Sequence, residues 1–196
     1  GDNTTKEYRS ILVAQEINTG KREDRFAATP PLEAKMVLTS IVSSKTGTKG
    51  RRRIGLDFIG ARRAYFHAKA RREVYVQLPE EDYEEGMCGK LVMAMYGTRD
   101  AAQNWEYEYT DMMKNLGFAS GKNNPCVFHN GERGIVAVVH GDDFTALGTP
   151  DGLDKYEKGM TQTFECKMKG LLHIMTRWPS GFILSVTSTG KRLTLP

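Results

Sequence analysis

Long hydrophobic runs are missing from this sequence of 196 residues. A membrane-spanning helix needs roughly 18 or more consecutive apolar residues, and no stretch approaches that length. The polar start, GDNTTK, also lacks the apolar segment of a signal peptide. The sequence therefore predicts a soluble, intracellular chain with no membrane partner, and it does not specify a compartment.

Cysteine is scarce and internal repeats are absent. The three cysteines, Cys88, Cys126 and Cys166, are widely spaced and free of any C-x-x-C pattern. This excludes a disulfide framework and argues against a zinc site, so we expect buried free thiols. With 39% hydrophobic residues, a chain of this length can bury a core as one domain or two small lobes.

Positive charge is present but unevenly distributed. The net charge is only +4, yet basic residues crowd into residues 45–53 and 62–72. Contacts from Lys and Arg to phosphates supply most of the sequence-independent affinity for nucleic acids, so a polyanionic partner is favoured. A solvated basic loop is the alternative for residues 45–53.

Apolar periodicity predicts a mixture of strands and helices. Strands are expected over residues 10–17, 54–59, 74–78 and 182–186. Helices are expected over residues 32–43, along the stripe Trp105, Tyr109, Met112 and Leu116 up to Gly117, and from Pro150 to Phe164. The Asn130-Gly131 pair lies between two apolar runs and predicts a hairpin.

Two adjacent carboxylates interrupt the most apolar part of the chain. Residues 135–139 (IVAVV) end in His140-Gly141-Asp142-Asp143 and continue as residues 144–147 (FTAL), which places the aspartates at a hairpin tip. Anions beside an apolar element repel each other and lose hydration, which favours a bound oxygen-seeking cation such as Mg²⁺. A solvated turn is the alternative, because Asp is itself a common turn residue.

Six segments carry a family resemblance, and each is weak alone. They are residues 8–15 (YRSILVAQ), 26–32 (FAATPPL), 74–79 (VYVQLP), 88–105 (CGKLVMAMYGTRDAAQNW), 116–128 (LGFASGKNNPCVF) and the aspartate pair. In this order they resemble the reverse transcriptases of copia-type retrotransposons, and more distantly the retroviral enzymes. In that family the pair lies in a Y-V-D-D motif.

The resemblance implies an α+β fold, the polymerase palm, in which helices back an antiparallel sheet. It divides the chain into a fingers-like segment, residues 1–53, and a palm-like segment, residues 54–196. The fingers lobe would be partial, and residue 196 comes before room for a thumb or an RNase H region. Whether the chain is part of a longer polyprotein stays open.

The chemistry implied is RNA-directed DNA synthesis. An RNA template, a DNA primer and deoxynucleoside triphosphates would be the partners, and two Mg²⁺ or Mn²⁺ ions would activate the attacking oxygen and stabilise the leaving one. By resemblance, Asp142 and Asp143 are the catalytic, metal-binding carboxylates. Holding two ions also takes a carboxylate from a second strand, which is expected near residues 54–59.

That second carboxylate is missing from its expected position. In the family an aspartate lies five residues before an aromatic residue, and counting back from Tyr65 gives Gly60. Asp57 is the nearest substitute, but on a strand it lies roughly 10 Å away and points to the opposite face. It could serve only if the strand register slipped, which would also invert the burial of its neighbours.

Further roles follow from the resemblance, each with a structural alternative. Tyr65 and Ala61 would contact the incoming nucleotide, although Tyr65 is nearly as well explained as a core aromatic. His140, which replaces the family's tyrosine, would contact primer backbone or else be a partly buried turn residue. Nucleic-acid phosphates would be bound by the basic segment, through Lys49, Arg51, Arg52 and Arg53.

Three functional hypotheses remain open. A working polymerase needs Asp57 or solvent to complete the metal site. A non-catalytic nucleic-acid-binding remnant needs only the basic surface. A structural relic of a decayed mobile element needs neither, and the departures from the family at Ile11, Gln15, Gly60 and Ala102 favour it over the second hypothesis. The sequence therefore predicts a copy with impaired catalysis.

Overall fold

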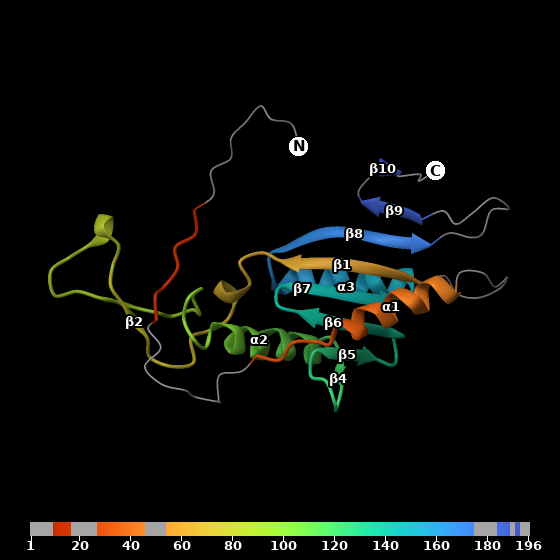
Figure 1. The fold of residues 1–196 in the computed structure, drawn as a ribbon, viewed down its shortest axis with the longest axis horizontal. Coiled ribbons are helices and arrows are strands. Elements are labelled where there is room, and N and C mark those ends of the chain that lie inside the picture. Colours follow the sequence, from red (N-terminus) through yellow and green to blue (C-terminus); the bar gives the residue numbers. More distant parts are fainter. Residues whose placement is uncertain (1–9, 17–26, 46–53, 175–183, 189–190, 193–196) are drawn as a thin grey trace.

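The structure is a computed structural model that describes residues 10–16, 27–45, 54–174, 184–188 and 191–192. These residues form three α-helices, one large antiparallel sheet and a small two-stranded ribbon (Figure 1). The fold is therefore mixed α and β, as the sequence predicts.

The elements have the following bounds. The helices are α1 (Leu32–Lys45), α2 (Ala101–Asn115) and α3 (Pro150–Thr163), with 3₁₀ turns η2 (Ala64–His67) and η3 (Glu80–Asp82). The sheet contains β1 (Gly55–Ala61), β4 (Ala119–Ser120), β5 (Val127–Asn130), β6 (Ile135–His140), β7 (Asp143–Gly148), β8 (Cys166–Ile174), β9 (Leu184–Ser188) and β10 (Lys191–Arg192). The ribbon pairs β2 (Tyr75–Val76) with β3 (Gly89–Lys90).

The sheet is antiparallel in the order β10-β9-β8-β1-β7-β6-β5-β4. Strand β1 lies at its centre and pairs with β7 on one side and β8 on the other. Because β6 and β7 form a hairpin, the end of β1 and the tip of that hairpin lie next to each other. This junction brings the candidate residues together.

Helices cover both faces of the sheet. Figure 1 shows α1 in front of the sheet and α3 behind it. The larger core lies under α2 and α3, and its aromatic members include Trp105, Tyr109, Phe128, Phe144 and Tyr156. The smaller core lies under α1 and joins Leu38 and Val42 to sheet residues Leu56, Val138 and Leu147.

Local signals explain where α3 begins and where α2 ends. The hydroxyl of Thr149 accepts a hydrogen bond from the Gly152 N–H at 3.3 Å, and Pro150 occupies the first position of α3. Helix α2 buries Trp105, Tyr109 and Met112 and is followed by Gly117, which has φ = 83°. The predicted helices and the predicted hairpin between β5 and β6 are confirmed.

Other predicted elements differ from those observed. The predicted strand at residues 10–17 is wrong, since residues 10–16 form no strand; Ala14 N–H instead donates to the Tyr96 carbonyl at 2.8 Å. The predicted strand at 74–78 shortens to β2, although its alternating exposure is as expected. The last predicted strand corresponds to β9, with residues 182–183 outside the described part. Cys126 is buried but Cys88 is exposed, so the prediction of buried thiols fails there.

The predicted segment boundary does not separate α1 from the sheet. Helix α1 lies within residues 1–53, for which a fingers-like segment was predicted, yet Leu38 and Val42 share a core with strands of residues 54–196. Among the described helices, none has the length and apolar character needed to cross a membrane.

Candidate functional site at the β6–β7 hairpin tip

The backbone of the β6–β7 tip is held by two hydrogen bonds. Trp105 Nε1–H donates to the Gly141 carbonyl at 2.8 Å, and Ala61 N–H donates to the Asp142 carbonyl at 2.8 Å. Gly141 has φ = 63°, a conformation that glycine adopts without steric cost. The tip is thus fixed to α2 and to the end of β1.

The two aspartates at this tip are hydrated. Asp142 is exposed, and the side chain of Asp143 is 42% exposed. The prediction from the sequence that the pair loses hydration is therefore wrong. Because water can solvate both carboxylates, the pair does not need a bound cation to compensate for lost hydration.

Gly60 lies directly opposite Asp143. The two residues are register partners between β1 and β7. A Cβ atom built on Gly60 would lie 3.5 Å from Asp143 Oδ1. A carboxylate at residue 60 would therefore adjoin Asp143, which is the geometry that a shared metal ion needs.

The space beside Gly60 is filled by Lys169 of β8. The Lys169 ammonium donates to Asp143 Oδ1 in an ion pair. A Cβ on Gly60 would lie 2.9 Å from Lys169 Cε, which is closer than real Cβ contacts. Sequence reasoning missed Lys169, because only the pairing of β1 with β8 brings it to the tip.

The side chains at the tip do not fit a two-metal centre. The position opposite Asp143 carries no ligand atom, and an ammonium group contacts Asp143 instead. Within the described residues, no group of three or more His, Cys, Asp or Glu side chains could hold a metal ion.

Asp57 is remote from this site. It is 4% exposed, and its Oδ2 atom has no hydrogen-bond partner. Burial raises the pKa of Asp57 to about 6, with a further contribution from the negative charges of Glu157 and Asp154 on α3. Asp57 therefore faces α3, on the side of the sheet away from Gly60, as strand alternation implies.

The two predicted nucleotide-contacting residues differ in access. Ala61 is 3% exposed and belongs to the larger core, so its side chain is not available to a ligand. The Tyr65 ring is partly buried and lies 4.4 Å from the Tyr96 ring. Burial raises the pKa of the Tyr96 phenol, and the Asp142 carboxylate adds to this shift. The aromatic pair thus lies near the tip.

His140 is exposed and contacts α1. Lys35 Nζ lies 3.5 Å from His140 Nδ1. An ammonium nitrogen cannot accept a hydrogen bond, so Lys35 is the donor. The prediction of a partly buried histidine is wrong. The other predicted nucleic-acid contacts, Lys49, Arg51, Arg52 and Arg53, lie outside the described residues.

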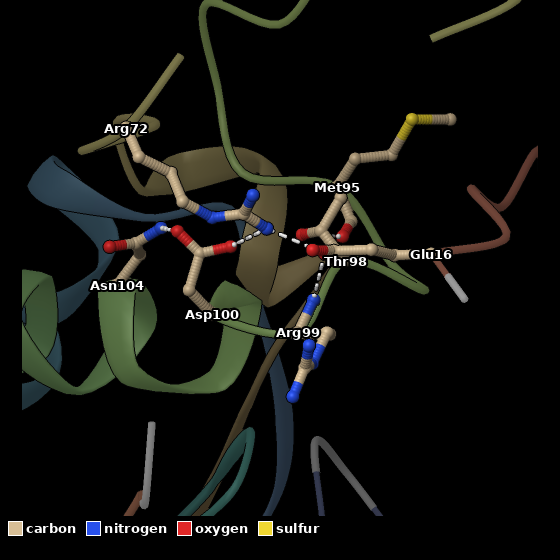
Figure 2. A network of polar contacts seen from close by, with 7 residues as sticks. All are labelled: Glu16, Arg72, Met95, Thr98, Arg99, Asp100 and Asn104. Carbon is tan, nitrogen blue, oxygen red and sulfur yellow. Dashed lines mark hydrogen bonds and ion pairs between the residues drawn. The ribbon is translucent and has the colours of Figure 1, made fainter. Parts of the chain in front are cut away.

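Three arginines of the second basic cluster are engaged in ion pairs. Arg62 and Arg63 contact the two oxygens of Glu165 at 3.3 Å and 2.5 Å. Figure 2 shows Arg72 between the carboxylates of Asp100 and Glu16, at 2.9 Å and 2.5 Å. This neutralisation weakens the argument for a polyanion-binding surface over residues 62–72.

The network around Arg72 connects three separate parts of the chain. Glu16 also accepts from the Arg99 N–H, and Asp100 accepts from the side-chain amide of Asn104 on α2 (Figure 2). Although burial alone raises it, hydrogen bonds from Arg72 and Asn104 hold the pKa of Asp100 below its ordinary value. Arg72 therefore ties residues 10–16 to the start of α2.

Comparison with known proteins finds a similarity to the retrovirus-related Pol polyprotein from transposon TNT 1-94 of Nicotiana tabacum. The two are 23% identical over 177 residues, which cover 87% of this chain and 13% of that polyprotein. No protein-family profile and no solved structure matches the chain. The similarity supports an origin from a retrotransposon and fits a chain that is part of a longer polyprotein.

Proposed function

We propose that this chain is a reverse transcriptase palm segment from a copia-type retrotransposon, and that this copy has lost polymerase activity. Its similarity to a transposon Pol polyprotein supports the origin. The six matched sequence segments and the antiparallel sheet backed by helices support the assignment to a palm.

One observation carries the loss of activity. Residue 60 is the register partner of Asp143, the place where a second strand would contribute its carboxylate, and it is glycine. Polymerase chemistry depends on positioning and on neutralising phosphate charge with two metal ions. Without a carboxylate at residue 60, and with Asp57 facing α3, the described residues lack this arrangement.

Primer extension on an RNA template with Mg²⁺ tests this proposal. We expect no extension by the native chain above the background of its Asp142→Ala variant. Extension should require Gly60→Asp combined with Lys169→Met, because the Lys169 ammonium would otherwise pair with the new carboxylate and with Asp143 in place of a metal ion. Adding Asp142→Ala to that double variant should abolish the gain.

Binding of the same primer–template is measured in parallel by fluorescence anisotropy. This distinguishes a chain that fails to extend because it does not bind primer–template from one that binds but does not catalyse extension. Extension by the native chain that Asp142→Ala abolishes would contradict the proposed loss of activity. A double variant that binds primer–template but never extends it would contradict the proposal that the tip is the only defect of a polymerase palm.

A further inference from the structure

We propose that the ammonium group of Lys169 occupies the position at the β6–β7 tip where a divalent cation would contact Asp143, so that Asp142 and Asp143 bind neither Mg²⁺ nor Mn²⁺. The inference rests on contacts among Lys169, Gly60 and Asp143. It does not depend on the chain's descent from a polymerase, and its test uses no nucleic acid.

The Lys169 ammonium group lies where a side chain at residue 60 would lie. Lys169 donates to Asp143 Oδ1, the same oxygen that would lie 3.5 Å from a Cβ on residue 60. That hypothetical Cβ would also be 3.3 Å from Lys169 Nζ. The cation and the absent side chain therefore compete for the same space, and the absence of a side chain at Gly60 leaves room for the lysine.

A backbone irregularity in β8 directs Lys169 to the tip. Phe58 pairs with Gly170 and Ile59 pairs with Met168, so Lys169 is an extra residue of β8 with no partner on β1. Such a bulge re-aims a side chain relative to strict alternation. Gly170, directly after it, has φ = 118°, which is a glycine conformation. The sheet is thus built to present Lys169 to Asp143.

Further positive charge lies around the tip. Lys167 is the register partner of Gly60, and Lys35 of α1 donates to His140 at the end of β6. Lys169 is 44% exposed, so its ammonium is solvated and screened rather than buried. A divalent ion that approached Asp143 would have to displace the Lys169 ammonium group, whereas the solvent-exposed Lys167, which has no ion pair with Asp143, would add only weak, screened repulsion.

Titration with Mn²⁺, followed by electron paramagnetic resonance of the free ion, tests the proposal without any enzymatic activity. The native chain should show no saturable site in the millimolar range. Lys169→Met keeps the apolar stem and removes the charge, and combining it with Gly60→Asp adds the missing carboxylate. Because affinity rises with the number of charged ligands, that double variant should bind Mn²⁺ at least about tenfold more tightly than the native chain.

Lys167→Met is the matched control. It removes the same charge from the same strand but no ion pair with Asp143. The Mn²⁺ binding of this variant should therefore stay within about twofold of that of the native chain. Thermal melts provide a second measurement on the single variants. Mg²⁺ should leave the melting temperature of the native chain and Lys167→Met unchanged and should raise that of Lys169→Met.

Two results would overturn the proposal. One is saturable Mn²⁺ binding by the native chain that Asp143→Asn removes. The other is a Lys169→Met variant whose melting temperature and Mn²⁺ binding respond to the ion no differently from those of Lys167→Met. If the double variant fails to fold, the single variants still decide between these outcomes.

Discussion

At the residue scale, Asp57 makes the stability of the chain sensitive to pH. Its pKa is raised from 3.8 to about 6 by burial and by nearby negative charges, so the folded chain holds this proton more tightly than the unfolded chain. The resulting stability is fully present below pH 3.8 and is lost as the pH rises through about 6. A shift of about two pH units corresponds to at most about 3 kcal/mol.

Replacing Asp57 with Asn should remove this dependence. We expect Asp57→Asn to match the native chain near pH 4 and to exceed its free energy of unfolding at pH 8 by at most about 3 kcal/mol. Urea unfolding of both proteins across this range measures the difference. If the difference in free energy of unfolding between the native chain and the variant stays constant with pH, Asp57 is not the responsible group.

Of the residues at the tip, Gly60 could be predicted from the sequence and Lys169 could not. The position of Gly60 opposite an aspartate could be predicted, because spacing to Tyr65 is a local property of the chain. The ion pair between Lys169 and Asp143 could not, because it depends on which strand lies beside β1 and on an extra residue in that strand. No spacing along the chain encodes that neighbour.

At the element scale, Gly170 should be required for the shape of β8. It has φ = 118°, and an alanine there would be strained whatever space surrounds it. We expect Gly170→Ala to lower the free energy of unfolding by about 1–3 kcal/mol. In the Gly170→Ala background, Lys169→Met should lower the free energy of unfolding by less than it does in the native chain, because the bulge that presents Lys169 is disturbed.

Gly131→Ala is the control for that experiment. No atom lies within 4 Å of a Cβ built on Gly131, and its φ is not positive. Its free energy of unfolding should stay within about 0.5 kcal/mol of the native value. Equal effects of the two substitutions in urea titrations would contradict a special role for the backbone at Gly170.

Elements with local signals could be predicted, and elements that depend on distant partners could not. Helix α3 has a capping threonine and an apolar face, and the β5–β6 hairpin has Asn130-Gly131 in its connection, so both follow from short windows. Strand β8 mixes lysines with apolar residues and contains a bulge, and it was not predicted. Residues 10–16 have strand-like composition, but no sheet edge pairs with them.

At the scale of the whole molecule, α1 should stabilise the sheet. Leu38 is 3% exposed and packs with Leu56 and Leu147, whereas Met36 on the same helix is 60% exposed. We expect Leu38→Ala to lower the free energy of unfolding by about 2–5 kcal/mol. The matched substitution Met36→Ala should change it by no more than about 0.5 kcal/mol.

Hydrogen exchange resolves where the effect of Leu38→Ala appears. If α1 and the sheet form one cooperative unit, amides of β1, β6 and β7 should lose protection together with those of α1. Loss of protection confined to residues 32–45 would instead support a fingers-like segment that unfolds independently of the sheet.

The hydrogen bond from Trp105 to the Gly141 carbonyl gives the chain an optical reporter of its own hairpin tip. The indole is 1% exposed and is bonded directly to the backbone between His140 and Asp142. Any event that lifts or twists the tip should change the emission wavelength and quantum yield of this chromophore. The sequence has two tryptophans, so replacing Trp178 with phenylalanine would leave one emitter whose signal follows the Asp142–Asp143 pair in solution.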